Sequence, residues 1–160
     1  MDIYISQASW TDAEKLSDLI RRTLRESNLP DYPEEEIDRL CDHYSPERIR
    51  SFISCKQLFL ALDKQGAATG CAALELSKGE TDTAWVTTVF VDPKFQKKGL
   101  GKVLMDLIES SAISQDIKIL RLGSSITAHE FYLKLGFKDI CESENTISSK
   151  GIFLMQKKLA

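Results

Sequence analysis

A short glycine loop rich in lysine is the part of the sequence best suited to bind a phosphate group. An apolar run breaks at Pro93, and a helical pattern begins at Leu100. Gly99 and Gly101 let the backbone approach an anion closely. The chain has a net charge of −3, yet four lysines lie in or beside this loop with no acidic residue among them: Lys94, Lys97, Lys98 and Lys102. Free backbone N–H groups at a helix N-terminus, together with this positive charge, predict an anion-binding site.

Two common phosphate loops do not fit this spacing. A dinucleotide-binding fingerprint needs a third glycine where this chain has Leu104. A Walker A loop needs four residues between its glycines and Ser or Thr after the lysine, whereas Val103 follows Lys102 here. For the loop considered alone, an ordinary strand-to-helix turn with solvated lysines is the alternative.

Metal chemistry is not indicated by the remaining reactive side chains. The four cysteines are scattered without C-x-x-C spacing, and the chain has two histidines, so no zinc-binding set is expected. We expect reduced and mostly buried thiols. These residues are Cys41, Cys55, Cys71, Cys141, His43 and His129.

The pattern of apolar residues predicts alternating helices and strands around this loop. In the first half we expect a strand near Ile3–Ile5, followed by a helix that starts at a capping box at Thr11–Glu14 and runs to about Glu26. A break at 28–33 should separate this helix from two more, over Glu34–Cys41 and Glu47–Ile53. Strands should follow at Leu58–Leu62, Cys71–Leu76 and Trp85–Val91. After the loop we expect a helix over Leu100–Ile113, a strand over Ile117–Leu122, a helix over Thr127–Leu135 ending at Gly136, and a last strand over Gly151–Lys157.

Two segments resemble motifs of one enzyme family. The loop Gln96-Lys97-Lys98-Gly99-Leu100-Gly101 fits the pattern Gln/Arg-x-x-Gly-x-Gly/Ala of GCN5-related N-acetyltransferases, the GNAT superfamily. Downstream, the segment Ala128 to Phe137 looks like that family's Ala-x-x-x-Tyr-x-x-x-Gly-Phe. The order of expected elements is similar over nearly all 160 residues. The resemblance implies an α/β (α+β) fold with a mixed, mostly antiparallel sheet flanked by helices on both faces.

The resemblance also implies where acetyl-CoA would bind. The backbone of Gln96 through Lys102 would hold the pyrophosphate, as the physics of a helix N-terminus allows. The preceding strand, at Val89, Phe90 and Val91, would pair with the pantetheine arm, and a backbone N–H near Val89 would polarise the thioester carbonyl. Ser125 stands where many relatives have an asparagine that contacts this arm.

The same resemblance implies that Tyr132 protonates the leaving thiolate as a general acid. The alternative is a core tyrosine beside Phe131 with its hydroxyl at the surface. No metal or redox cofactor is implied.

The base that deprotonates the acceptor amine is less clear. The position used by a histone-acetylating branch of the family is Trp85 here. Glu75 on the neighbouring strand is the substitute carboxylate, although an exposed structural glutamate or a water relay are alternatives. Acidic residues between Asp31 and Asp42 could attract a cationic amine, or simply favour a helix N-terminus.

Composition bounds the remaining expectations. We expect a single domain over residues 1–160, located in the cytoplasm, without a signal sequence or membrane span, and with no nucleic-acid partner. The predicted activity is transfer of an acetyl group from acetyl-CoA to a primary amine, and a small-molecule acceptor is favoured over a protein. A non-catalytic acyl-CoA sensor or interaction module is the alternative, and a homodimer is possible because many relatives dimerise.

Overall fold

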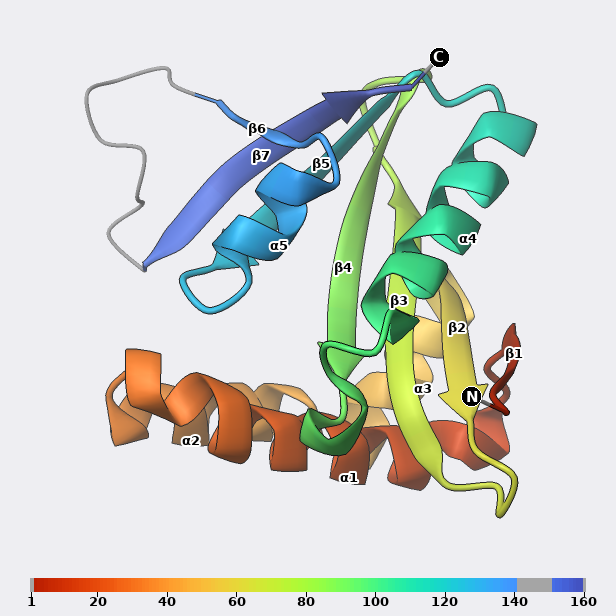
Figure 1. The fold of residues 1–160 in the computed structure, drawn as a ribbon. Helices are drawn as coiled ribbons and strands as arrows, with labels where there is room; N and C mark the ends of the chain where they lie inside the picture. Colours follow the sequence, from red (N-terminus) through yellow and green to blue (C-terminus); the bar gives the residue numbers. More distant parts are fainter. Residues whose placement is uncertain (1, 141–150, 160) are drawn as a thin grey trace.

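A mixed sheet forms the centre of the computed structural model, which describes residues 2–140 and 151–159. In that part of the chain the sheet has seven strands in the order β1-β2-β3-β4-β5-β7-β6 (Figure 1). Neighbouring strands are antiparallel except β4 and β5, which are parallel. The strands are β1 (Tyr4–Gln7), β2 (Gln57–Leu62), β3 (Ala68–Leu76), β4 (Thr83–Val91), β5 (Ile119–Ser125), β6 (Lys138–Asp139) and β7 (Ile152–Lys158). The predicted fold class, a mostly antiparallel mixed sheet with helices, is confirmed.

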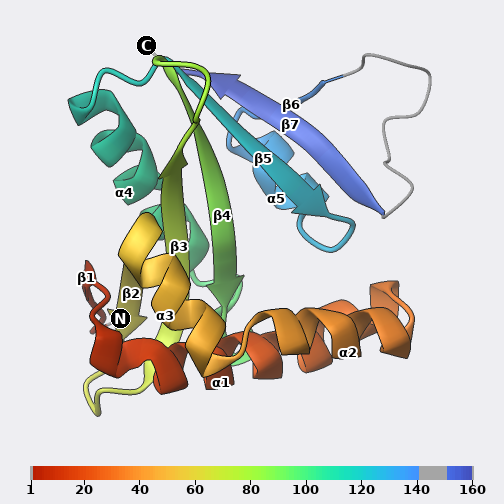
Figure 2. The same cartoon turned by 180° about the vertical axis from the view of Figure 1, so that it is seen from behind.

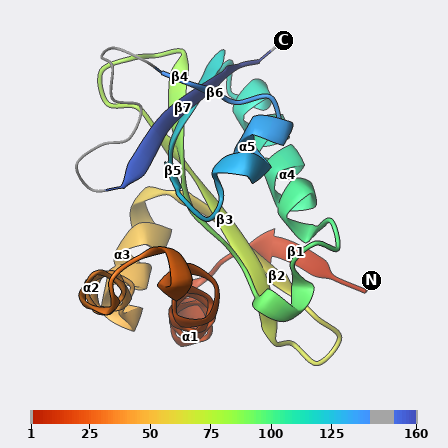
Figure 3. The ribbon, with the colours of Figure 1, turned by 60° about the vertical axis from the view of Figure 1, so that its left-hand side comes forward.

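Helices cover both faces of this sheet. Figures 2 and 3 show α4 and α5 on one face and α1, α2 and α3 on the other. Side chains of β2 alternate between two cores because successive residues of a strand point to opposite faces: Phe59 and Ala61 pack with α4, whereas Leu58 and Leu60 pack with α1 and α3. The helices are α1 (Ala13–Thr23), α2 (Glu34–His43), α3 (Pro46–Cys55), α4 (Leu100–Ser114) and α5 (His129–Lys134).

No helix within the described residues combines the length and the apolar character that crossing a membrane requires.

The N-terminal half departs from expectation in two ways. The capping box lies two residues earlier than predicted, because the backbone N–H of Ser9 donates to Asp12 at 2.8 Å and a short 3₁₀ turn, η1 (Trp10–Asp12), precedes α1. After Thr23 the helix continues as a π-helical turn, η2 (Leu24–Asn28), and a 3₁₀ turn, η3 (Leu29–Asp31). π-turns are rare, and apolar periodicity does not distinguish them from α-helix.

The cysteines follow the expectation in part. Cys41 and Cys71 are buried free thiols, Cys55 is an exposed free thiol, and Cys141 lies outside the described residues.

Strands β4 and β5 diverge after a short paired section. Thr83–Trp85 pair with Ile119–Arg121, and beyond Trp85 no pairing between these strands is found in the described chain. The ribbon in Figure 1 shows the two strands splaying toward the end where β4 leads into the glycine loop. This divergence leaves one side of β4 without a neighbouring strand over its last residues.

Candidate active site

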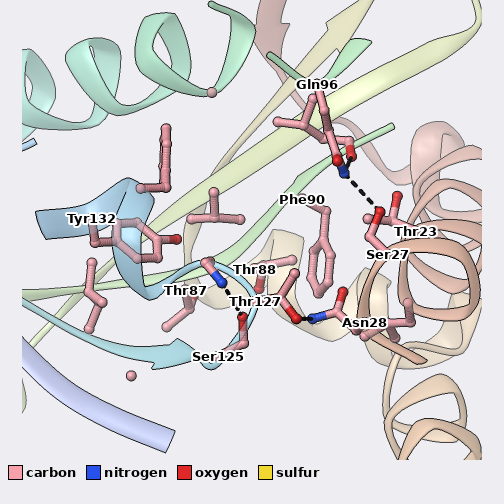
Figure 4. A pocket seen from close by; sticks show the side chains of 18 of the residues that line it. Thr23, Ser27, Asn28, Thr87, Thr88, Phe90, Gln96, Ser125, Thr127 and Tyr132 are labelled. Atoms are coloured by element: carbon pink, nitrogen blue, oxygen red, sulfur yellow. Dashed lines mark hydrogen bonds between the residues drawn. The ribbon is translucent and has the colours of Figure 1, made fainter. Parts of the chain in front are cut away.

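A cavity of about 750 Å³ lies where β4 and β5 separate. Its walls come from β4, β5, the glycine loop, α4, α5 and the segment from α1 to α2, and Figure 4 shows part of this lining. Most of the predicted site residues meet there: Val89, Phe90, Val91, Gln96, Lys97, Gly99, Gly101, Lys102, Ser125 and Tyr132. Three others, Lys98, Leu100 and Glu75, are not among the lining residues.

The glycine loop has the backbone form of an anion-binding turn. Lys97 and Gly99 both have positive φ, 60° and 89°. A Cβ atom on Gly99 would meet no atom within 4 Å, so the backbone there borders open space. The first N–H groups of α4, at Leu100, Gly101 and Lys102, have no acceptor within the helix. Leu100 contributes only this backbone group, because its side chain is buried in the core.

The second glycine of the motif has a packing role. A Cβ on Gly101 would lie 3.0 Å from Cζ of Phe131, so this position lets α4 and α5 approach one another closely. The positive φ angle therefore favours glycine at Gly99, and the nearby Phe131 ring favours glycine at Gly101.

Two side chains from α1 and η2 hold the loop in place. The Arg22 guanidinium pairs with the buried Asp92 carboxylate at 2.5 Å. The Gln96 amide nitrogen donates both to the Val91 carbonyl and to the Ser27 hydroxyl, each at 2.9 Å. The Gln96 side chain thus fastens the loop to the end of β4 and to η2, and Figure 4 shows its hydrogen bond to Ser27.

The four lysines near the loop differ in their surroundings. Lys102 pairs with Asp106 at 2.8 Å, and this hydrogen bond raises the pKa of Lys102. The Lys98 ammonium lies 5.7 Å from the centre of the Phe95 ring. Of these four, Lys97 and Lys102 line the cavity, together with Lys134 from α5, and they bring positive charge to this end of it.

A β-bulge redirects β4 beside the cavity. Phe90 pairs with Cys71 and Thr87 with Ala73, which leaves Thr88 and Val89 opposite a single residue of β3. Thr88 has a φ of 55°, a strained value for a β-branched residue. Bulges re-aim the chain next to functional sites. Here the bulge coincides with the residue whose backbone N–H was predicted to polarise a thioester.

Tyr132 is buried with its hydroxyl group directed into the cavity (Figure 4). Its ring makes edge contacts with Phe131 and Phe137, at centroid distances of 5.1 and 5.8 Å. Burial raises the pKa of Tyr132 above its usual range. The hydroxyl therefore stays protonated at neutral pH and can donate a proton or a hydrogen bond to a group in the cavity.

The opposite side of the cavity is closed by contacts that the sequence did not indicate. The Tyr32 hydroxyl accepts from the Ile126 N–H at 2.7 Å and donates to the Gly151 carbonyl at 2.9 Å. The Thr127 hydroxyl donates to Asp31 at 2.6 Å. These partners lie roughly a hundred residues apart in sequence, so local patterns carry no signal for them. Together they join η3 to the β5–α5 loop across the cavity.

A match to a protein-family model decides the family. The model of the acetyltransferase (GNAT) domain matches residues 28–159, which is most of the chain. The protein belongs to the GNAT family. The recognition made from the two motifs is confirmed, and the acetyltransferase activity and acetyl-CoA cosubstrate implied by the resemblance are those of this family.

Solved structures of GNAT enzymes share the fold. PaiA N-acetyltransferase from Thermoplasma acidophilum, in complex with coenzyme A, has a TM-score of 0.84 and 23% identity, covering 99% of this chain and 100% of that one. N-acetylglutamate synthase from Neisseria gonorrhoeae, complexed with coenzyme A and N-acetyl-glutamate, has a TM-score of 0.74 and 22% identity, covering all of this chain and 36% of that one. Aminoglycoside 6'-acetyltransferase type Ii has a TM-score of 0.74 and 21% identity, covering 97% and 96%.

In this GNAT domain the predicted base lies behind the cavity wall. Glu75 pairs with Lys56 at 3.5 Å and lines a smaller cavity with Trp85 and Thr87. Thr87 lines both cavities, and its hydroxyl accepts from Lys56 at 3.3 Å. Glu75 is therefore connected to the main cavity through two side chains and does not face it directly.

The two histidines lie outside the GNAT cavity lining. His129 hydrogen-bonds Asp139 at 2.8 Å and stacks on Phe153, with ring centroids 3.9 Å apart. His43 packs against Tyr44 and Phe52, and burial lowers the pKa of His43. Across residues 2–140 and 151–159, no group of three or more His, Cys, Asp or Glu side chains is arranged to hold a metal ion.

Proposed function

We propose that this protein transfers an acetyl group from acetyl-CoA to a primary amine on a small molecule, by direct attack while both are bound. The observation that carries the proposal is the convergence of three features on one cavity: the open backbone at Gly99, the bulge at Val89, and the inward hydroxyl of Tyr132. Each of these suits a different part of a thioester substrate.

The donor half of the cavity fits a phosphorylated carrier. The backbone of Gln96 through Lys102 would hold the pyrophosphate, with charge from the lysines that line the cavity. The side of β4 that faces away from β3 at Val89, Phe90 and Val91 offers backbone groups to the pantetheine arm, apart from the Val91 carbonyl, which already accepts from Gln96. Ser125 would contact the same arm, although its hydroxyl already accepts from the Ala128 N–H at 3.1 Å. Bound acetyl-CoA supplies the activated acyl group.

The residues around the bulge would assist transfer. The Val89 N–H would stabilise charge that develops on the thioester oxygen, a contribution typically of a few kcal/mol in such sites. Tyr132 would give its proton to the departing sulfur. Glu75 would act as base from outside the cavity, with water beside Thr87 carrying the proton from the acceptor ammonium toward it.

Ligand-dependent stability tests the donor half first. Acetyl-CoA and CoA should raise the melting temperature of the protein, whereas ATP and NAD should not. A ligand that binds the folded state and is present at 100 times its dissociation constant adds about 2.7 kcal/mol to the free energy of unfolding. Amines are then screened for acetyl-dependent release of free thiol. If neither CoA ligand stabilises the protein at millimolar concentration, the glycine loop is a structural turn and the proposal is wrong.

A further inference from the structure

We infer that the acceptor is a monoamine whose remaining body is uncharged and apolar, an inference that rests on the proposed acetyl transfer. The acceptor half of the cavity is the part formed by the segment from Thr23 to Tyr44 together with Thr127 and Ile152, opposite α4 and α5. Two independent observations support the inference about the acceptor: the charges in this half of the cavity and the apolar character of its walls.

Within residues 2–140 and 151–159, the lining of the acceptor half carries no uncompensated negative charge. Among the described residues that line the cavity, Glu36 is the one carboxylate, and it pairs with Arg39 of the same cavity wall through two hydrogen bonds. The two charges offset each other over one turn of α2. A cation bound nearby would therefore meet a neutral wall.

Three other carboxylates near the cavity are engaged by groups of the protein itself. Asp31 accepts from Thr127, Asp38 pairs with Arg25 at 3.1 Å, and Asp92 pairs with Arg22. The acidic run between Asp31 and Asp42, which suggested attraction of a cationic amine, thus consists partly of carboxylates held by the protein's own groups. Within the described lining, a second ammonium on the acceptor would lose water without meeting a carboxylate that lacks a cationic partner.

The walls of the acceptor half are aromatic and aliphatic. Tyr44 and Phe90 meet edge to face with ring centroids 5.3 Å apart, and both line the cavity. Burial raises the pKa of Tyr44 to about 12, as expected where water is largely excluded. Leu24, Leu40 and Ile152 complete this surface. The hydroxyl and amide groups of this surface are uncharged, and each already takes part in a hydrogen bond within the protein: Thr23, Ser27, Asn28 and Thr127.

Three amines of equal length separate the possibilities: hexylamine, 1,6-diaminohexane and 6-aminohexanoate. We expect kcat/KM for hexylamine to exceed that for each of the others by about tenfold or more, a factor equal to 1.4 kcal/mol. The diamine has two reactive amino groups, so its kcat/KM is halved before it is compared with that of hexylamine. Equal or better use of the diamine would overturn the inference, and so would preference for the carboxylate, which would make Arg39 a recognition group.

Binding of acetyl-CoA distinguishes failure of this inference from failure of the proposed function. If acetyl-CoA stabilises the protein but none of the three amines is acetylated, the assignment of the acceptor is wrong while the donor half stands. If acetyl-CoA does not stabilise the protein, both the proposed function and the inference about the acceptor are wrong.

A charge introduced into the wall provides a second test. Leu40→Glu places a carboxylate on α2 facing the cavity, and Leu40→Gln is its uncharged control of similar size. The ratio of kcat/KM for the diamine to that for hexylamine should be about tenfold higher in the Glu variant than in the Gln variant. An unchanged ratio would contradict placement of the acceptor body against α2. Stabilisation by acetyl-CoA confirms that each variant is folded.

Discussion

The hydroxyl oxygen of Tyr32 accepts a hydrogen bond from the backbone N–H of Ile126 at 2.7 Å, and so joins two segments 94 residues apart. The same hydroxyl donates to the carbonyl of Gly151, the residue directly before β7. One side chain thus fixes the α1–α2 connection, the β5–α5 loop and the last strand around the acceptor half of the cavity.

Replacing Tyr32 should weaken acceptor binding selectively. Tyr32→Phe leaves the Ile126 N–H and the Gly151 carbonyl without this partner, which should lower the free energy of unfolding by about 1–3 kcal/mol. We expect KM for the amine to rise several-fold while the dissociation constant of acetyl-CoA changes less than about twofold. Tyr4→Phe, at an exposed tyrosine of β1, is the control and should change neither value. Parallel loss of acetyl-CoA affinity would contradict a role confined to the acceptor half.

The φ angle of Gly99 should matter for binding as well as for folding. Gly99→Ala imposes a left-handed conformation on an L-residue, at a cost of roughly 1–2 kcal/mol, and should weaken acetyl-CoA binding measured by calorimetry. Gly99→Asn should be milder because asparagine tolerates this region. Gly66 has a similar φ of 79° and open surroundings in the β2–β3 turn, so Gly66→Ala controls for strain alone. Equal loss of acetyl-CoA affinity in the Gly66 variant would remove the site-specific interpretation.

Tyr132 should affect the rate of turnover more than binding. Tyr132→Phe removes the proposed proton donor and keeps the ring contacts with Phe131 and Phe137. General acid catalysis of this kind contributes about 10²-fold at the lower end of its usual range. We expect kcat to fall by that order, with CoA affinity within about threefold of the parent. Because burial raises the pKa of Tyr132, the parent should lose no activity through this group up to about pH 10. An unaltered kcat would exclude the role of acid.

The contribution of Glu75 should depend on pH. Glu75→Gln should lower kcat/KM about tenfold at pH 7, where the amine is mostly protonated and needs a base. The deficit should shrink near pH 10, where more of the amine is already neutral. Glu80→Gln removes a comparable surface carboxylate, one that pairs with Arg121 at 2.9 Å, and should have no effect on the rate. A deficit that stays constant with pH would indicate a structural role through the Lys56 pair.

Stability should decline at alkaline pH because buried groups, Cys71 and Tyr44 among them, resist ionisation. Burial raises the pKa of the Cys71 thiol from 9.0, and that of Tyr44 from 10.0, to about 12 in each case. The unfolded chain therefore releases these protons first, so the stabilisation is fully present below pH 9 and is lost as pH rises from 9 toward 12. Each group contributes a slope of about 1.4 kcal/mol per pH unit where it is ionised only in the unfolded state.

Urea unfolding between pH 8 and 11 measures this decline. Cys71→Ala should flatten it, whereas Cys55→Ala, at an exposed thiol, should leave the slope unchanged. Identical slopes in the two variants would show that the Cys71 thiol is not responsible.

The sequence by itself determined the donor side of this protein. The requirements there are local: a positive φ at Gly99, free N–H groups at the start of α4, and lysines within a few residues of both. Such features depend on neighbouring residues and on helix geometry, so a motif of six residues predicts them. The order of strands and helices followed from apolar periodicity for the same reason, and family recognition rested on both.

The acceptor side was decided by tertiary structure. Tyr32, Asp31 and Thr127 come together only when η3 packs against the β5–α5 loop, and none of them has a local pattern that marks it. The same holds for Gln96, whose partner Ser27 is 69 residues away. The location of Glu75 behind Thr87 depends on the sheet and on Lys56, which directly follows α3. Glu36 and Asp38, which the sequence displays within an acidic run, are paired with arginines in space, because Coulomb interactions depend on distance and exposure and not on sequence order.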